Sequence, residues 1–193
     1  MGRIAHFDND QFFDTALALL VEGGPAAVTV TGIAERLGAP VGSFYHRFPS
    51  RDVIVAGLWL RTAETFQKGF LELLAKGDGA EAALYTVRWA RSHPEEGSLL
   101  LLHRQEELTW RAWPEEMKEQ AAELAKALRA GLRQFTKKWF GYISRKAFDR
   151  VVFALADVPL AAVQRHLQAG RKLPKGLDEL VRETSLAVLG RKK

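Results

Sequence analysis

Hydrogen-bonding side chains and aromatic rings gather in one short stretch of the chain, AERLGAPVGSFYHRFPSRDV, at residues 34–53. Ser43 and Tyr45 carry hydroxyl groups, His46 carries an imidazole and Arg51 a guanidinium. Each of these groups donates hydrogen bonds, and phosphate oxygens and the acceptor atoms on the edges of nucleobases are suitable partners. The stretch is therefore suited to recognition by hydrogen bonding.

Residue patterns typical of catalysis do not occur in the sequence. The chain has no cysteine, which excludes disulfides, thiolate metal sites and cysteine nucleophiles. It also has no Ser/His/Asp signature, phosphate-binding loop or HExxH sequence. His103 and Glu107 lie four positions apart and could share one face of a helix in a metal site, but the other ligands are missing. We therefore expect a protein that is not an enzyme, with no catalytic residues, no metal and no cofactor.

Apolar residues recur every three to four positions through most of the chain, which is the pattern of amphipathic helices. The pattern extends over residues 58–74, 121–139, 148–167 and 177–188, and glycine or proline separates these segments. Only residues 28–30 have the composition of a strand, and three residues cannot build a sheet. The sequence therefore predicts an all-α fold of about nine helices.

Three short helices are predicted before residue 50. Asp8 and Gln11 have the spacing of a capping box at the start of the first helix. Thr29 is placed to cap the second helix, and Gly38 to end it in the left-handed conformation. Pro40 suits the first turn of a third helix, because its missing N–H would have no partner there. The second and third helices thus form a helix-turn-helix.

The third helix is expected to have two unlike faces over two turns. Phe44 and Phe48 lie four positions apart and form an apolar stripe. The other positions carry small, hydrogen-bonding or aromatic residues, namely Gly42, Ser43, Tyr45 and His46. A solvated face would favour Glu, Lys or Gln, and a glycine in a helix costs about 1 kcal/mol relative to alanine. Close approach of another surface explains the glycine, as for a recognition helix in the major groove of DNA.

Two further helix starts are placed to bind phosphate. The second helix begins at Thr29–Thr31 and a long fourth helix begins at Ser50–Arg51, with Ser50 as its cap. The first N–H groups of a helix have no partner within it and can donate to phosphates. Together with the third helix, these starts predict a nucleic-acid-binding module.

The stretch from Phe12 to Ile54 resembles the tetracycline-repressor (TetR) family of bacterial transcription regulators. The sequence DTALALLVEGG resembles the first helix of the family, and TVTGIAERLGAPVGSFYHRFPSRDVI resembles its helix-turn-helix signature. The positions that match in the signature are Thr29, Ile33, Ala34, Gly38, Gly42, Tyr45, Phe48, Pro49 and Arg51. The resemblance covers under a quarter of the chain.

The resemblance implies roles for individual residues. Thr29, Tyr45 and Arg51 stand at positions that typically contact phosphates, and Tyr45, His46 and Arg51 are expected to be left free to contact DNA. The groove-facing turn consists of Pro40, Val41, Gly42, Ser43 and His46. Val41 stands where lysine is frequent in the family, and Pro40 where serine or threonine is frequent. These departures predict weaker non-specific binding and an apolar contact with a thymine methyl group.

The resemblance also implies how the whole chain is organised. A DNA-binding domain would occupy residues 1–50, and an effector-binding and dimerisation domain residues 51–193. A homodimer would form through helices at about 145–169 and 176–189. The run VVFALADVPLAAV at 151–163 is apolar on nearly every side, which fits a buried dimer interface. The core of a monomer would give the same sequence pattern. Pro159 predicts a kink in that helix.

An effector cavity is a further expectation from the resemblance. Bulky residues lie between the two modules, and a cavity lined by them would bind an apolar or aromatic small molecule. The candidate ligand-binding residues are Phe66, Phe70, Trp89, His103 and Trp110. Core packing explains the same residues, and the sequence leaves this choice open.

We therefore expect a cytoplasmic transcriptional regulator, a repressor in the more frequent mode of the family. It would bind a pseudo-palindromic double-stranded DNA operator as a homodimer and be released by its effector. No membrane partner is expected, because the longest purely apolar run covers only residues 99–102. The alternative is a helical protein-interaction module that kept the fold without DNA binding. Residues 1–50 hold three Lys or Arg against five Asp or Glu, although the whole chain carries +5, and this acidic balance favours the alternative.

Overall fold

Helices make up the regular structure of the residues that the computed structural model describes, which are 7–103, 108 and 110–190. They are α1 (Asn9–Gly23), α2 (Val30–Leu37), α3 (Val41–Tyr45), α4 (Arg51–Lys76), α5 (Gly79–Ser92), α6 (Pro94–Leu102), α7 (Glu115–Phe140), α8 (Arg145–Val152), α9 (Val158–Gln168) and α10 (Leu177–Leu189). A π-helical turn at Phe153–Asp157 joins α8 to α9 in one continuous helix, and 3-10 turns lie at Pro25–Ala27 and Trp110–Ala112. With that join, the described residues form nine helices, which confirms the all-α prediction. None of these helices is long and apolar enough to cross a membrane.

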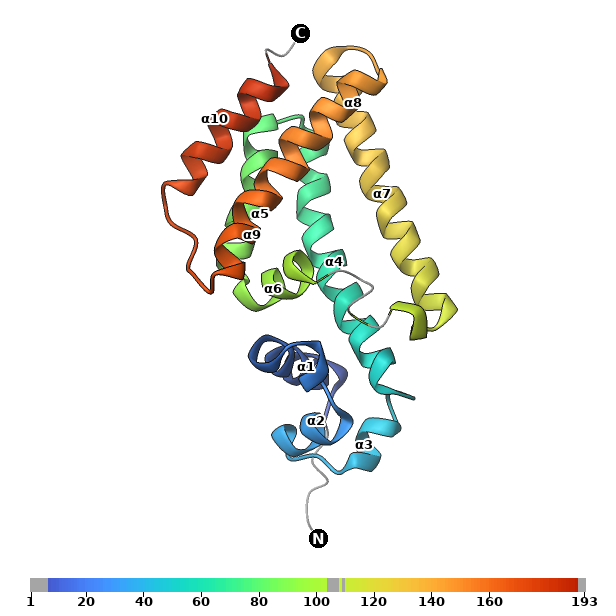
Figure 1. Cartoon of the computed structure of the whole chain (residues 1–193). Coiled ribbons are helices and arrows are strands. Elements are labelled where there is room, and N and C mark those ends of the chain that lie inside the picture. The colour runs from blue at the N-terminus through green and yellow to red at the C-terminus, as the bar shows by residue number, and fades with distance from the viewer. Residues whose placement is uncertain (1–6, 104–107, 109, 191–193) are drawn as a thin grey trace.

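The helices form a small head and a larger body (Figure 1). The head consists of α1, α2 and α3 and lies at the end of the molecule opposite the C-terminus. The long helix α4 runs from the head into the body, where it packs on α5 and α7. In the body, α10 packs on α5, and α6 lies between the body and α1. The head is therefore joined to the body through α4 and α6.

The capping signals of the sequence are confirmed at the helix starts. Asp8 and Gln11 form a reciprocal capping box, with hydrogen bonds of 2.8 and 2.9 Å between each side chain and the other's backbone N–H. The hydroxyl of Thr29 accepts from the N–H of Gly32 at 3.0 Å, and Ser50 caps α4 in the same way. Gly38 ends α2 with φ of 68°, a left-handed conformation that glycine adopts without strain.

The third helix is shorter than the two turns that the sequence predicted. It spans only Val41–Tyr45, and Pro40 precedes it as the cap instead of opening its first turn. The N–H groups of Arg47 and Phe48 both donate to the carbonyl of Phe44, at 2.9 Å, which tightens the chain into a turn. Pro49 favours an extended conformation at Phe48, the residue before it. The helix therefore does not continue beyond this turn.

The first hydrophobic core holds the head together. The rings of Phe12, Phe44 and Phe48 meet one another at centroid distances of 5.5 to 6.1 Å, and all three side chains are buried. The first two turns of α4 belong to the same cluster, as do Leu99 of α6 and Trp113. The core of the head therefore continues past residue 50 into the body.

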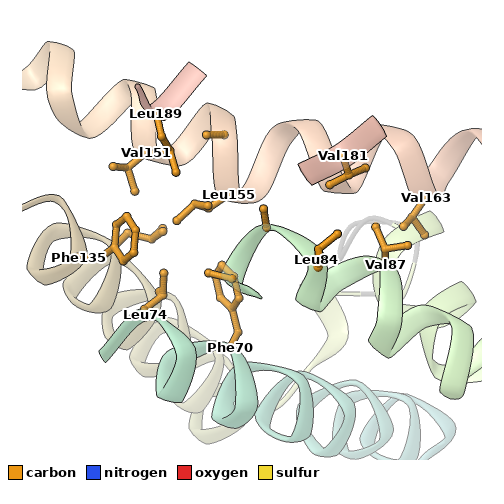
Figure 2. Packing of buried hydrophobic residues seen from close by; sticks show 14 of the residues in the cluster. Phe70, Leu74, Leu84, Val87, Phe135, Val151, Leu155, Val163, Val181 and Leu189 are labelled. Atoms are coloured by element: carbon orange, nitrogen blue, oxygen red, sulfur yellow. The ribbon is translucent and has the colours of Figure 1, made fainter. Parts of the chain in front are cut away.

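The second hydrophobic core fills the body, and Figure 2 shows its packing. Helices α4 to α10 supply it, and α4 contributes to this core as well as to the first. Its buried residues include Phe70, Leu74, Leu84, Val87, Phe135, Val151, Leu155, Val163, Val181 and Leu189. Because α4 lies in both cores, its direction couples the head to the body.

One arginine ties α1 to α4. The guanidinium of Arg61 in α4 pairs with Asp10 at 3.0 Å and with Asp14 at 2.7 Å, both in α1. It also lies 5.1 Å from the centre of the Phe13 ring. At Gly57, one turn earlier in α4, a Cβ would come within 2.9 Å of that ring. The two helices therefore approach closely, and the ion pairs fix their relative position.

Pro159 shapes the middle of the α8–α9 helix. The N–H of Val158 donates to the carbonyl of Phe153, five positions back. The next carbonyl, that of Ala154, would accept from residue 159, but proline has no N–H. The hydroxyl of Ser185 in α10, which is fully buried, donates to this carbonyl at 2.7 Å. The irregularity expected at Pro159 thus takes the form of a π-helical turn.

Replacing Ser185 by alanine is expected to lower the free energy of unfolding by about 1–3 kcal/mol, because the buried carbonyl of Ala154 loses its donor. Urea denaturation followed by circular dichroism measures the change. Ser92→Ala is the matched control. The hydroxyl of Ser92 also donates to a backbone carbonyl, that of Arg88 at 3.0 Å, but this residue is exposed, so water can replace the lost donor. Equal effects of the two substitutions would contradict this role of Ser185.

Candidate nucleic-acid interface

The helix-turn-helix is built from α2, the turn at Gly38 and α3. Phe44 anchors α3, because its side chain is fully buried against α1 and α4 residues of the first core. Most of the DNA-binding residues expected from the sequence are exposed on the head: Thr29, Thr31, Pro40, Val41, Gly42, Tyr45 and His46. Ser43 and Arg51 are half-buried. The exposed residues come from the start of α2 and from α3 with the residues on either side of it.

Gly42 is not explained by the packing of the head. A Cβ added at this position would meet no atom within 4 Å, and its backbone conformation is one that any residue adopts. Gly57, in contrast, has no room for a side chain because Phe13 lies against it. A glycine at a free, helical position lowers helix stability without any benefit inside the protein. Room for an external surface against α3 accounts for it.

The arginines of the head donate to oxygen atoms of the protein itself. Arg36 forms two hydrogen bonds with Glu22, at 2.5 and 2.6 Å. Arg47 donates to the carbonyls of Ser43 and Phe7. The described part of the head therefore presents hydroxyl, imidazole and backbone N–H donors, with its guanidinium groups held in internal contacts.

The side chain of Arg51, expected from the sequence to be left free for DNA, makes contacts within the protein. Its guanidinium donates to the carbonyls of Val28, at 2.6 Å, and Pro25, and it pairs with Asp52 at 3.1 Å. These carbonyls belong to the 3-10 turn at Pro25–Ala27 and to the residue after it, where a short turn leaves acceptors without helical partners. Arg51 therefore holds the α1–α2 connection against α4. The contact of its backbone N–H with phosphate stays a prediction.

The geometry suits recognition of base edges by neutral groups. Val41 is 44% exposed and Tyr45 is 56% exposed, so an apolar surface and a hydroxyl stand beside His46 on α3. The first turns of α2 and α4 offer backbone N–H groups, which bind phosphate without a full charge.

A sequence model described as "Bacterial regulatory proteins, tetR family" matches residues 12–58. These residues contain the whole helix-turn-helix and the anchoring first turns of α4. The helix-turn-helix segment of this chain thus matches that of the tetR family of regulators. The family consists of regulators and not of enzymes, and its members bind DNA and small-molecule effectors as dimers.

Solved structures show the same fold over nearly the whole chain. The fatty acid degradation regulator FadR from Bacillus halodurans is 17% identical, with a TM-score of 0.69 over 99% of this chain and 100% of its own. FadR from Bacillus subtilis, solved in complex with stearoyl-CoA, is 16% identical, with a TM-score of 0.73 over 95% of this chain and 98% of its own. PfmR from Thermus thermophilus, a TetR-family regulator, is 16% identical, with a TM-score of 0.63 over 98% of this chain and 99% of its own. No curated protein matches the chain.

Three of the candidate ligand-binding residues form one aromatic cluster in the body. The Phe66 ring stacks on Phe70 at 6.0 Å and meets Trp89 edge-on at 5.0 Å between centroids. Phe70 and Trp89 are buried, at 3% and 5% exposed, and Tyr85 lies against the same rings at 5.3 Å from Phe66. The rings therefore pack on one another as a core does. That they contact an effector stays a prediction.

The remaining ligand-binding candidates lie elsewhere. His103 is half-buried and follows the last residue of α6. The side chain of Trp110, and Glu107 of the possible metal pair, lie outside the described residues. Among the described residues, no group of three His, Asp or Glu is close enough to hold a metal ion.

Gly42→Ala is expected to weaken DNA binding at least about tenfold, because the added methyl group occupies the space reserved for DNA. The free energy of unfolding should stay within about 1 kcal/mol of the wild-type value, since alanine is the better helix former. Fluorescence anisotropy with a duplex that the protein selects from a random-sequence library measures the affinity. Gly176→Ala is the matched control, because a Cβ there also meets nothing within 4 Å but lies on the α9–α10 loop and not on α3. Wild-type affinity in Gly42→Ala would contradict the assigned face.

Because the described arginines of the head form their contacts within the protein, we expect the affinity for DNA to depend only weakly on salt concentration. We expect the slope of log affinity against log salt concentration to have a magnitude below ~4, since each phosphate that a cation neutralises contributes about 0.9. The measurement is a salt titration of the same duplex. A slope of about 8 or more would show that cationic side chains carry the binding.

Proposed function

We propose that this regulator binds a pseudo-palindromic DNA operator as a homodimer and represses transcription until a small apolar or aromatic effector releases it. The observation that carries the proposal is Gly42, a glycine with free space around it in the middle of an exposed, neutral helix face. The proposed division places DNA binding in residues 1–50, and effector binding and dimerisation in 51–193. As a regulator of transcription, it would act in the cytoplasm.

The dimer is supported by an exposed apolar face on α8–α9 and α10. Phe153 is 50% exposed and Leu180 is 60% exposed, although large apolar side chains are normally buried. Val152 and Val188 lie half-buried beside Phe153 along a shallow groove between the two helices. A symmetric partner would cover this face. Its two heads would then read half-sites about 34 Å apart, one turn of DNA, or a multiple of that spacing.

Release by an effector is supported by the position of α4. A ligand that changes the packing of α4 in the body also turns the end of α4 that carries the head. The ligand must bind more tightly to the state that does not bind DNA. To shift the populations of the two states from 1:99 to 99:1, its binding free energies for them must differ by about 5.5 kcal/mol. The complex of Bacillus subtilis FadR with stearoyl-CoA supports an apolar ligand for this fold.

A helical protein-interaction module without DNA binding is the second candidate. The acidic balance of residues 1–50 and the internal contacts of Arg36, Arg47 and Arg51 favour it. Selection of duplexes from a random-sequence library by the purified protein separates the two. Recovery of an inverted repeat supports the regulator function proposed here, and no enrichment at low salt supports the interaction module.

Phe153→Glu combined with Leu180→Glu is expected to give a folded monomer whose affinity for the selected duplex is at least about 100-fold weaker, because one head alone makes half of the contacts. Light scattering after size exclusion gives the mass, and circular dichroism checks the fold. Ala125→Glu, an equally exposed change on α7, is the control and should leave both the mass and the affinity unchanged. A dimer that persists in the double variant would place the interface elsewhere.

A further inference from the structure

A hollow of about 600 Å³ lies where the head meets the body. Three segments that are far apart in the sequence form it: the C-terminal end of α1, the junction of α5 and α6, and the loop from α9 to α10. In Figure 1 this loop reaches down beside α6, toward α1. The volume lies within the range of small-molecule sites. None of the ligand-binding residues expected from the sequence lines this hollow.

The walls of the hollow are apolar. Val21 of α1, Ala90 of α5, Pro94 of α6 and Leu167 and Leu173 at the ends of the α9–α10 loop line it. Val21 is 42% exposed, which is high for a large apolar side chain. These walls suit a hydrocarbon chain, which gains about 0.8 kcal/mol for each CH₂ group that it buries.

The rim of the hollow is cationic. Arg171, Lys172 and Lys175, all on the α9–α10 loop, line it, and none of them forms an ion pair with a described residue. Glu95 is the acidic residue of the lining. It lies close enough to Arg36 of α2 to contribute, after the hydrogen bond from Glu22, to raising the pKa of Arg36. The charge that faces a ligand is therefore positive.

A polar tether holds the cationic loop in place. Arg91 at the end of α5 donates to the carbonyl of Pro174 at 3.2 Å and to both carboxylate oxygens of Asp178, at 2.5 and 3.3 Å. The hydrogen bond from Arg91 lowers the pKa of Asp178, which favours the charged carboxylate. Arg91 is thus used to position the loop, and the three other cations remain at the rim.

We propose that this hollow binds an amphiphile with an anionic head group, its apolar chain against Val21 and Leu173 and its head group at Arg171 and Lys172. Such a ligand contacts α1 and the body at once. Val21 precedes Glu22, which pairs with Arg36 of α2, so the occupied site borders directly on the helix-turn-helix. That this ligand is also the effector rests on the function proposed above.

Dodecanoate is the probe for the site, and isothermal titration calorimetry of the full-length protein measures its binding. Dodecanol and dodecyltrimethylammonium have the same chain with a neutral and a cationic head group, and both are expected to bind at least about tenfold more weakly. Dodecanoyl-coenzyme A distinguishes a thioester ligand from a free acid, because the two share the chain but carry the negative charge on different groups. Tight binding of either anion supports the site. If neither dodecanoate nor dodecanoyl-coenzyme A binds, the proposed site is overturned.

Two variants locate the ligand. Arg171→Glu with Lys172→Glu is expected to weaken dodecanoate at least about tenfold and to leave dodecanol unchanged, because only the head-group contact is reversed. Val21→Asp is expected to weaken both ligands, since it places a charge in the apolar wall. All three positions are exposed, so the fold should persist, and Lys126→Glu on α7 is the control for the change in charge. Wild-type dodecanoate binding in both variants would overturn the proposal.

Dodecanoate binding that leaves the affinity for DNA unchanged would support the site and contradict only its role as the effector site.

Discussion

The membership of α4 in two hydrophobic cores is the constraint on which the rest of the structure depends. Its first turns pack with the phenylalanine rings of the head, and Phe70 and Leu74 pack in the body. Between them, Arg61 pairs with two aspartates of α1. A helix resists bending because each turn is hydrogen-bonded to the next. The position of the head is therefore set by the packing of the body, as a ligand-controlled DNA-binding protein requires.

The head uses its guanidinium groups to hold its own architecture together. Arg51 holds the α1–α2 connection, Arg47 holds the segment before α1, and Arg36 joins α2 to α1. Fifty residues bury too little apolar surface to be stable alone, and such contacts secure their connections. The exposed face is left with neutral donors and apolar groups. Attraction to any DNA is then expected to be weak, and base edges contacted by the proposed face of α3 would contribute a larger share of the affinity.

Local signals in the sequence predicted the local structure. Thr29, Gly38 and Ser50 act as caps or turns within a few residues of their partners, so the sequence was sufficient to place them. The end of α3 and the contacts of Arg51 were missed, because they depend on carbonyls brought close by folding. The aromatic residues of α4 and α5 could not be assigned to a core or a cavity, since periodicity gives the buried face and not what fills it. The hollow at the head was missed because its walls come from three distant segments.

The central claim, that α4 makes the head and body one unit, can be tested directly because the chain has no native cysteine. A single spin label at Glu35→Cys, an exposed position on α2, reports the distance between the two heads of the proposed dimer by pulsed electron paramagnetic resonance. We expect a single narrow distance distribution in the absence of ligand and DNA. A broad distribution, or several populations, would show that the heads move independently of the body and would contradict this account.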